Sequence, residues 1–314
     1  MRLCVSACQS WRGSCTLKTD IMHENFLDLE QENGRLIHVL PVPYEGTVSF
    51  ATGTKQGPEA LIKASCEIET WDPEYKLDLA DLAHFRTAPV FTPPVSGPED
   101  MYKQMLDYLH TNFAPHRDML LTLGGEHSIA LPPIEFYRNY YSDLVVLQLD
   151  AHADLREQFQ SSKYSHACVM SRVRQMGIPL VQLGIRSLMK EEHHLIDSAE
   201  QSEMLTFFSS SLSDPETAAE KVLDFIGGRA LYITFDADGL DPSIMPGTGT
   251  PEPGGLSYTW LNRFWHQLLP RSGLVGLDFC ELMPLGAGGV VSESVGVQCI
   301  NKILISNLAG DVNS

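Results

Sequence analysis

Residues 145–156 read VVLQLDAHADLR, a mostly apolar run that leads directly into three polar residues at alternate positions. The run 145–149 has the composition of a buried β-strand, since aliphatic residues fill all but one of its positions. Asp150, His152 and Asp154 then follow at intervals of two, and side chains two residues apart in an extended segment point to the same side. Carboxylates and imidazoles are ordinary metal ligands. We therefore predict that the end of this strand presents metal ligands.

Other apolar runs also resemble strands, and amphipathic stretches separate them. The predicted strands lie at 36–42, 119–125, 144–150, 180–186, 204–208, 230–238 and 274–282. Helical periodicity is found at 98–113, 164–177, 214–227, 258–269 and 293–305. Alternation of this kind is typical of a parallel sheet with helices on both faces. The predicted fold class is α/β, with three α/β/α layers around a central, mostly parallel sheet.

The domain organisation is predicted to be simple. A chain of 314 residues is long enough for one large α/β domain or two smaller ones. We find no internal repeat or low-complexity linker, and the Pro-rich stretch 89–100 is predicted to be a loop rather than a domain boundary. The sequence therefore predicts a flexible N-terminal extension at 1–22 and a single domain at 23–314.

The composition excludes some partners. The formal net charge is −18, whereas nucleic-acid binding requires a basic surface, so we expect no nucleic-acid partner. An acidic field attracts cationic substrates, although solubility alone also explains such a charge. No apolar run approaches the roughly 18 residues of a membrane span, so we expect no membrane partner.

The seven cysteines are odd in number, and their spacing indicates no disulfide framework. Cys4, Cys8 and Cys15 lack the C-x-x-C pair that would support a metal cluster. Free thiols fit a reducing compartment, so the predicted location is the cytoplasm.

Two further segments repeat the arrangement of polar residues at a strand end. ITFDADGLDP carries Asp236 and Asp238, and LTLGGEHS places His127 just after a Gly-Gly turn. Ligands of parallel sheets bind beyond the carboxyl ends of the strands, so these groups are predicted to meet those of the first segment. Taken alone, the two aspartates could cap a loop. Three ionisable groups that end an apolar strand, however, are costly to bury without partners.

Four carboxylates and two imidazoles exceed what a single divalent ion needs. Two ions that share bridging carboxylates would use all of these groups. Oxygen-rich sites with some imidazole suit Mn²⁺, with Fe, Co, Ni and Zn as alternatives, whereas Mg²⁺ usually keeps more water. Paired ions about 4 Å apart activate a water molecule. The sequence therefore predicts two divalent ions per subunit, best suited to Mn²⁺, whose bound hydroxide is a nucleophile near neutral pH.

Together these motifs resemble the signatures of the ureohydrolase family, which comprises arginases, agmatinases and their relatives. GGEHS, DAHADLR and DADGLDPSIMPGTGTPEPGG occur in the family's order, and the resemblance extends from residue 41 to residue 284. The chain is most similar to agmatinases. Glu126 stands where arginases usually have Asp, and SSKYSHACVM lacks the Asn-containing loop that holds the amino-acid carboxylate. The resemblance implies an arginase-like fold and a substrate without that carboxylate, such as agmatine.

The resemblance also implies two sets of metal ligands that share Asp150 and Asp236 as bridges. One Mn²⁺ would be bound by His127, Asp150, Asp154 and Asp236, and the other by Asp150, His152, Asp236 and Asp238. Asp154 would in addition orient the attacking water, which makes it a catalytic residue.

Three more residues match family positions at the substrate. Glu281 corresponds to the carboxylate that holds the guanidinium through charge-assisted hydrogen bonds, and the alternative is an ordinary surface acid. His166 corresponds to a histidine that shuttles protons to the leaving amine. It is followed by Ala167, where many relatives have glycine, and the alternative is a solvated loop histidine. Thr250 is implied to line the pocket.

The implied reaction is hydrolysis of agmatine to putrescine and urea. Another guanidino compound such as 4-guanidinobutyrate is an alternative, and its carboxylate would require a basic or hydrogen-bonding residue in the pocket. A metal-dependent deacylase is a second alternative, which Glu281 disfavours, and a non-catalytic family member is the third. The family further implies a homo-oligomer, either a trimer or a hexamer.

Overall fold

The computed structural model describes residues 25–29, 32–286 and 290–313, so the predicted extension at 1–22 lies outside the described residues. Its centre is an eight-stranded sheet whose neighbouring strands all run parallel. The strand order is β4 (Ala83–Thr87), β1 (Arg35–Val42), β5 (Met119–Gly124), β10 (Gly273–Cys280), β9 (Ala230–Asp236), β6 (Val145–Leu149), β7 (Leu180–Ile185) and β8 (Met204–Phe208). A separate antiparallel pair is formed by β2 (Trp71–Asp72) and β3 (Leu77–Asp78).

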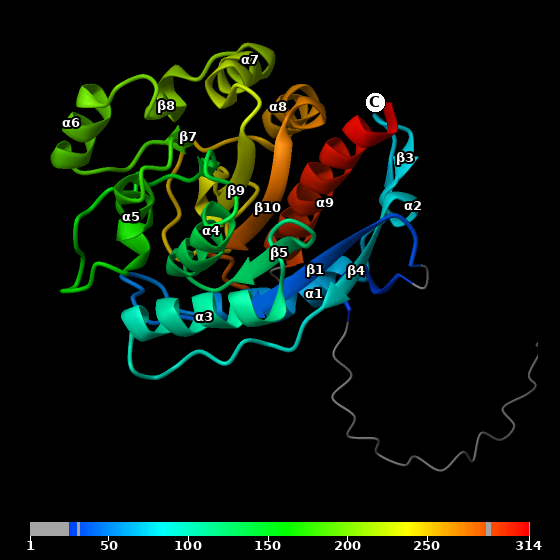
Figure 1. Ribbon diagram of the computed structural model, residues 1–314, viewed down its shortest axis with the longest axis horizontal. Helices are drawn as coiled ribbons and strands as arrows, with labels where there is room; N and C mark the ends of the chain where they lie inside the picture. Colours follow the sequence, from blue (N-terminus) through cyan, green and yellow to red (C-terminus); the bar gives the residue numbers. More distant parts are fainter. Residues whose placement is uncertain (1–24, 30–31, 287–289, 314) are drawn as a thin grey trace, which may run out of the picture.

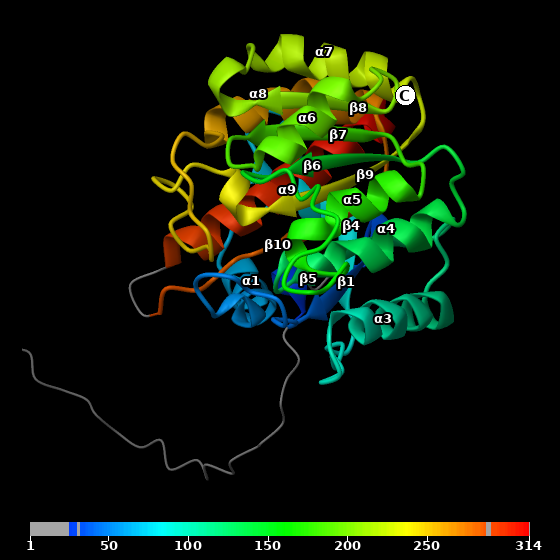
Figure 2. The same cartoon turned by 90° about the vertical axis from the view of Figure 1, so that its left-hand side faces the viewer.

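Helices cover both faces of the sheet and complete three layers (Figures 1 and 2). One face is covered by α1 (Gly57–Ser65), α2 (Leu79–Leu82), α7 (Pro215–Ile226), α8 (Tyr258–Leu268) and α9 (Val290–Asn313). The other is covered by α3 (Pro98–Asn112), α4 (Leu131–Arg138), α5 (Val169–Gln175) and α6 (Lys190–Ser198). The predicted α/β class with a central parallel sheet is confirmed.

Strand β6 shows why the apolar runs form the centre of the sheet. All of its residues are buried. Val145, Leu147 and Leu149 pack into the core under one helical layer, and Val146 packs into the core under the other. Each such aliphatic side chain stabilises the fold by roughly 1.5–3 kcal/mol when it leaves water. A strand that is buried on both faces therefore has an almost continuously apolar sequence.

Local signals set the ends of the helices. The Asp214 carboxylate accepts a hydrogen bond from the backbone N–H of Thr217 at 3.0 Å, and Pro215 begins α7. The same helix ends at Gly227, which has a left-handed φ of 58°. These residues account for the helix predicted at 214–227.

The structure also contains elements that the sequence did not predict. Strand β4 is a short edge strand that pairs only with β1 among the described strands, and α1 and α4 are short helices that lack long amphipathic periodicity. The helix predicted at 164–177 begins later, because Ser165 is extended and residues 166–168 form one 3-10 turn before α5. Local pattern is weakest for such short elements.

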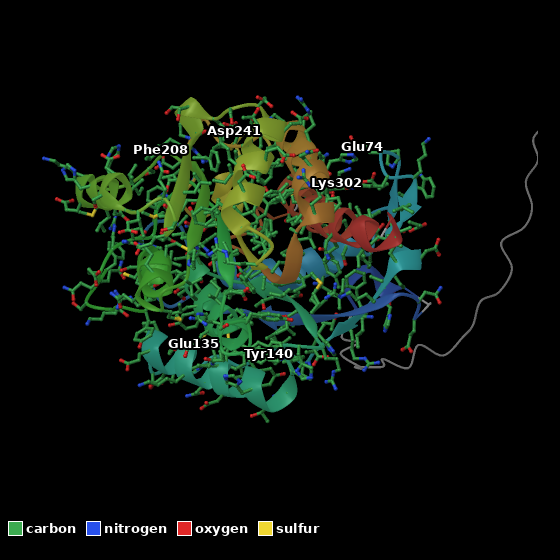
Figure 3. All side chains as sticks on the ribbon, turned by 45° about the horizontal axis from the view of Figure 1, so that its top comes forward. Glu74, Glu135, Tyr140, Phe208, Asp241 and Lys302 are labelled. Carbon is green, nitrogen blue, oxygen red and sulfur yellow. The ribbon has the colours of Figure 1, made fainter. Side chains whose placement is uncertain are left out.

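Helix α9 is long but carries buried polar groups. The ammonium of Lys302 pairs with Asp72 at 2.7 Å and with Glu74 at 2.5 Å, which ties α9 to the hairpin formed by β2 and β3 (Figure 3). Within the described residues, no helix combines the length and the apolar character needed to cross a bilayer.

The cysteines that the structure describes, Cys66, Cys168, Cys280 and Cys299, are free thiols. Cys4, Cys8 and Cys15 lie outside the described residues.

Candidate active site

The predicted ligands gather beyond the carboxyl ends of four adjacent strands, β5, β10, β9 and β6. Asp150 follows β6, Asp236 ends β9 and Glu281 follows β10. His127 lies just beyond β5, after a turn that requires glycine, because a Cβ on Gly125 would lie 2.0 Å from the carbonyl oxygen of Tyr44. The parallel topology thus brings segments more than 100 residues apart in sequence to one edge of the sheet.

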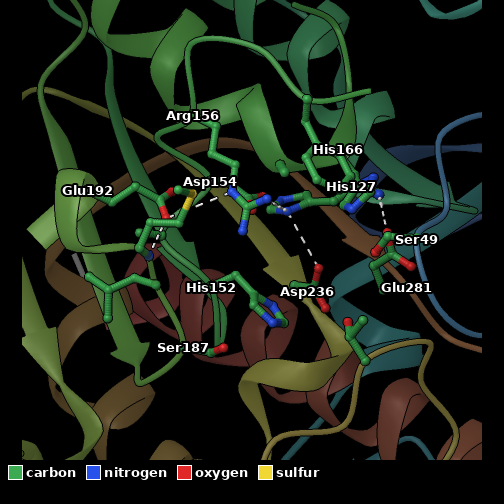
Figure 4. Close-up of a pocket in the computed structure, with 16 residues that line it drawn as sticks. Ser49, His127, His152, Asp154, Arg156, His166, Ser187, Glu192, Asp236 and Glu281 are labelled. Carbon is green, nitrogen blue, oxygen red and sulfur yellow. Dashed lines mark hydrogen bonds and ion pairs between the residues drawn. The ribbon is translucent and has the colours of Figure 1, made fainter. Parts of the chain in front are cut away.

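One group of polar atoms is centred on His127. Its Nδ1 atom lies 2.9 Å from Asp154 Oδ2, 3.2 Å from Asp150 Oδ2 and 3.5 Å from Asp236 Oδ2. Figure 4 shows His127, Asp154 and Asp236 converging from different elements. The His127 side chain is 1% exposed, so the group is sealed from bulk water on its inner side.

A second group is centred on His152 and shares Asp150 with the first. His152 Nδ1 lies 3.1 Å from Asp238 Oδ2 and 3.4 Å from Asp150 Oδ1. Within each group, His127–Asp150–Asp154 and Asp150–His152–Asp238, one ligand atom per residue lies within 4.8 Å of the others. Asp236 belongs to neither compact group. Its Oδ1 atom accepts a hydrogen bond from the backbone N–H of Asp238 at 2.9 Å, while its Oδ2 faces His127.

The site holds more negative than positive charge. Burial and repulsion from Asp238 and Asp150 raise the pKa of Asp236 well above its usual value. Burial and repulsion from Asp150 raise the pKa of Asp154 to about 7. Buried carboxylates without enough counter-charge are costly, and cations between them would remove the repulsion. The residues therefore fit divalent metal ions, and the oxygen-rich donor set with two imidazoles suits Mn²⁺.

Hydrogen bonds behind His127 select the tautomer that a metal ligand needs. The Thr234 hydroxyl donates to Asp278 Oδ1 at 2.8 Å, so it accepts a hydrogen bond from His127 Nε2–H, which lies 2.8 Å away. The Nδ1 atom of the neutral ring is then left with its lone pair facing the carboxylates. Metal-ligating histidines usually have such a partner on the other ring nitrogen.

In the metal-free chain both imidazoles are stabilised as cations. Burial lowers the pKa of His127, but hydrogen bonds to Asp150 and Asp154 outweigh it and raise the pKa well above the ordinary value. Burial also opposes the charge on His152, but Asp238 and Asp150 raise its pKa to about 12. Metal ions would therefore have to displace protons from this site.

The backbone departs from extended geometry at two of these acids. Strand β6 ends at Leu149, and Asp154 has a left-handed φ of 53°, so the regular alternation expected from Asp150 to Asp154 does not persist. Glu281 has a φ of 60°. A non-glycine residue in this region costs about 1–3 kcal/mol, which the surrounding contacts must offset.

Glu281 lines the cavity beside the metal-ligand candidates. One of its oxygens, Oε1, accepts a hydrogen bond from the backbone N–H of His127 at 2.7 Å. Burial and repulsion from Glu126 raise the pKa of Glu281 well above its usual value. Thr250 also lines the cavity, and its hydroxyl donates to Asp238 Oδ2 at 2.9 Å.

His166 is oriented by a chain of hydrogen bonds that begins at Glu126. The Glu126 carboxylate accepts hydrogen bonds from the backbone N–H and the hydroxyl of Thr47, both at 2.6 Å. Because that hydroxyl donates to Glu126, it must accept from the Nδ1–H of His166, which lies 3.0 Å away. The Nε2 atom of a neutral His166 is therefore unprotonated.

The surroundings of His166 favour its neutral form. Burial and the neighbouring charges of His127 and His152 lower its pKa to about 4. His166 is therefore a neutral base at physiological pH, not a group that is half protonated.

These residues surround one cavity of about 260 Å³. The candidates His127, His152, Asp154, His166, Asp236, Thr250 and Glu281 line it directly, while Asp150 and Asp238 support it from behind. The opposite wall contains Arg156 and Glu192 (Figure 4), and Met189 also lines the cavity. The Arg156 guanidinium lies over the Phe159 ring at 4.8 Å and 4.0 Å from the carboxylate of Glu192.

Comparison with known proteins agrees with this geometry. A model of the Arginase family matches residues 35–305, which is most of the chain. The chain belongs to the arginase family. Relatives within the family are N(1)-aminopropylagmatine ureohydrolase from Synechocystis sp., 34% identical over 85% of this chain and 87% of the relative, and agmatinase from Pyrococcus horikoshii, 30% identical over 78% and 82%.

Solved structures of the family share the fold. The agmatine ureohydrolase of Thermoplasma volcanium superposes with a TM-score of 0.75 at 24% identity, covering 92% of this chain and 96% of that one. The arginase from Bacillus subtilis superposes with a TM-score of 0.73 at 22% identity, covering 86% and 98%. The expected resemblance to the ureohydrolases is confirmed.

Sequence reasoning missed the residues that support the site. Thr47 lies in a loop without periodicity, and Thr234 and Asp278 lie within strands, where they read as ordinary sheet positions. Arg156 directly follows DAHADL, but its sequence position alone predicts no role. Proximity to a predicted ligand motif was the one signal that could have identified it.

Proposed function

We propose that this arginase-family chain hydrolyses the terminal guanidino group of agmatine and releases urea and putrescine. The observation that supports this most strongly is the buried excess of carboxylates around two imidazoles, with Glu281 facing the same cavity. The proposed ligands of two Mn²⁺ ions are His127, Asp150, His152, Asp154, Asp236 and Asp238. When bound, such a pair of ions activates water and polarises the guanidino group.

Glu281 is proposed to hold the substrate. Its Oε1 atom is occupied by the backbone N–H of His127, which fixes the carboxylate beside the ligands. Its second oxygen remains for the N–H donors of a guanidinium, and a charge-assisted hydrogen bond of this kind orients a planar cation. The raised pKa of Glu281 in the empty cavity means that a bound cation also stabilises its ionised form.

His166 is proposed to move the proton. Its Nδ1–H is committed to Thr47, so Nε2 is free to accept a proton from the attacking water. Burial of the ring, the main cause of its lowered pKa, favours release of that proton to the leaving amine. Asp154, held 2.9 Å from His127 Nδ1, is proposed to orient the water during attack.

Two other substrates have support. The N(1)-aminopropylagmatine named for the relative from Synechocystis carries the same guanidino group on a longer amine. For 4-guanidinobutyrate, Arg156 is a basic residue in the cavity, although Glu192 lies 4.0 Å from it and balances its charge.

A substrate panel tests the proposal. We expect protein loaded with Mn²⁺ to release urea from agmatine or from its aminopropyl derivative, and much more slowly from 4-guanidinobutyrate and arginine. Faster turnover of 4-guanidinobutyrate than of either amine would assign Arg156 to carboxylate binding. Bound Mn²⁺ without urea release from any guanidine would contradict the proposal.

We also propose that the chain forms a trimer or a hexamer, as the family resemblance implies, and that it acts in the cytoplasm, as its cysteine pattern indicates. Sedimentation of the purified chain tests the oligomeric state, and a monomer would contradict it.

A further inference from the structure

The catalytic cavity does not end at Arg156. A second hollow of about 460 Å³ adjoins it, and both are lined by Arg156, Phe159, Met189 and Glu192. We name this hollow the tail groove and define it by Leu155, Phe159, Met189 and Leu195 together with Glu157 and Glu191. Figure 4 shows Glu281 on one side of the cavity and Arg156 with Glu192 on the other. A guanidinium held by Glu281 therefore has the tail groove at the opposite end of its cavity.

The walls of the tail groove combine apolar surface with acidic groups. Met189 is 44% exposed and Leu195 is 37% exposed, so apolar surface faces solvent here. Glu157 and Glu191 are exposed acids of the same hollow, and the Glu157 carboxylate pairs with Arg172 at 2.9 Å. Arg156 is the only base that lines it within the described residues, and Glu192 lies 4.0 Å from that guanidinium. Apolar walls with excess negative charge suit an alkyl chain that ends in an ammonium group.

Backbone contacts keep the tail groove open. Glu192 accepts hydrogen bonds from the backbone N–H of Leu155 at 2.9 Å and of Met189 at 2.7 Å. This carboxylate therefore ties the loop after β6 to the start of α6, and these two segments form the opposite walls. Because its oxygens are committed to the backbone, Glu192 holds the shape of the groove, and the exposed Glu191 is the better partner for a mobile ammonium.

We propose that the tail groove binds an alkylammonium extension of the substrate, so that the chain prefers a guanidine with two amine-bearing segments over agmatine. This inference rests on the proposed function and specifies its substrate class. The methylene groups of the extension pack on Phe159, Met189 and Leu195, and its terminal ammonium lies toward Glu191. Agmatine fills the catalytic cavity but leaves the groove to water.

The test compares agmatine with agmatine that carries a 3-aminopropyl group on its amine, using urea release by the Mn²⁺-loaded full chain. We expect kcat/KM to be about tenfold higher for the longer substrate, the equivalent of burying a short alkyl segment. Leu195→Trp fills the groove and should bring the ratio of the two kcat/KM values close to one. Val95→Trp, at a fully exposed loop position, is the matched control and should keep the ratio.

A second pair of variants tests the charge. Glu191→Gln should lower kcat/KM for the longer substrate by about threefold, as expected for an exposed ion pair. Glu67→Gln, at an exposed site after α1 that does not line the groove, should leave this value unchanged. Equal kcat/KM values for the two substrates would contradict binding of the extension in the tail groove. An unchanged ratio of the two kcat/KM values in Leu195→Trp would do the same. Either result leaves the proposed function intact. Failure to hydrolyse either substrate would overturn the proposed function itself.

Discussion

The two ends of the catalytic cavity are built in different ways. At the metal-ligand end, His127 and Asp150 are almost completely buried, and each is held by several polar contacts from separate strands. At the tail groove, Met189 and Leu195 are partly exposed and belong to the short segment around α6. Under the proposed function, the interior of the sheet sets the chemistry, whereas a surface helix sets the length of the substrate. Changes at the two ends should therefore be separable.

The largest effect is expected at Asp150, which belongs to both ligand groups. Asp150→Asn should lower urea release by roughly a thousandfold, because the variant loses a shared anionic ligand. The loss should be equal for long and short substrates, since it concerns the chemistry alone. Metal analysis of the purified variant should show less bound Mn²⁺.

Asp143→Asn is the matched control, because Asp143 is exposed. Wild-type activity and wild-type metal content in Asp150→Asn would contradict a catalytic role for the buried cluster. The proposed division between a metal-ligand end and a substrate-length end of the cavity would then be wrong.

Glu281→Gln is the next largest change. It keeps the size of the side chain but removes the negative charge, so kcat/KM should fall about a hundredfold, the equivalent of one strong charge-assisted hydrogen bond. Bound Mn²⁺ should remain at the wild-type level. A fall in metal content as large as that in Asp150→Asn would assign Glu281 to the metal ions and not to the guanidinium.

Metal binding should stabilise the fold, and more so at higher pH. At a free Mn²⁺ concentration a hundred times Kd, the free energy of unfolding should rise by about 2.7 kcal/mol. The raised pKa values of His127 and His152 mean that the metal-free site holds protons at neutral pH. These protons must leave when metal binds, so affinity increases as pH rises from 6 to 8. Melting curves recorded with and without Mn²⁺ at pH 6 and at pH 8 measure the stabilisation. A smaller increase in Tm on adding Mn²⁺ at pH 8 than at pH 6 would contradict the prediction.

A smaller effect is expected at Thr47, which does not line the cavity. Thr47→Val should lower kcat about tenfold with little change in KM, because Nδ1 of His166 loses its acceptor and the ring loses its preferred tautomer. Thr47→Ser keeps the hydroxyl and should restore most of the rate. The pH profile of kcat should also change in the valine variant. Equal losses in the serine and valine variants would show that Thr47 acts only through packing.

The sequence predicted the centre of the fold better than its periphery. Parallel strands such as β6 are buried on both faces, so their composition alone identifies them. Edge strand β4 and helix α4 are short, and tertiary contacts rather than local pattern determine them. The sequence did not predict the order of the strands in the sheet. That order depends on which face of the sheet each connecting helix packs against.

At the site, the sequence identified the residues that belong to motifs. It did not identify the residues that form hydrogen bonds to them. Thr47 contacts His166 across 119 positions of sequence, and no local pattern reports such a pairing. The left-handed backbone at Asp154 was equally hidden, since DAHAD reads as a continuation of the strand. The low pKa of His166 also depends on charges from distant segments.

The left-handed backbone at Asp154 and Glu281 has a consequence for directed evolution. Glycine or asparagine adopts this conformation at lower cost, so either residue would relax the chain at these positions. Selection for heat resistance alone would therefore favour replacements that abolish turnover, which is the trade-off between stability and activity common at working sites. A library screened for thermal tolerance should keep these two codons fixed.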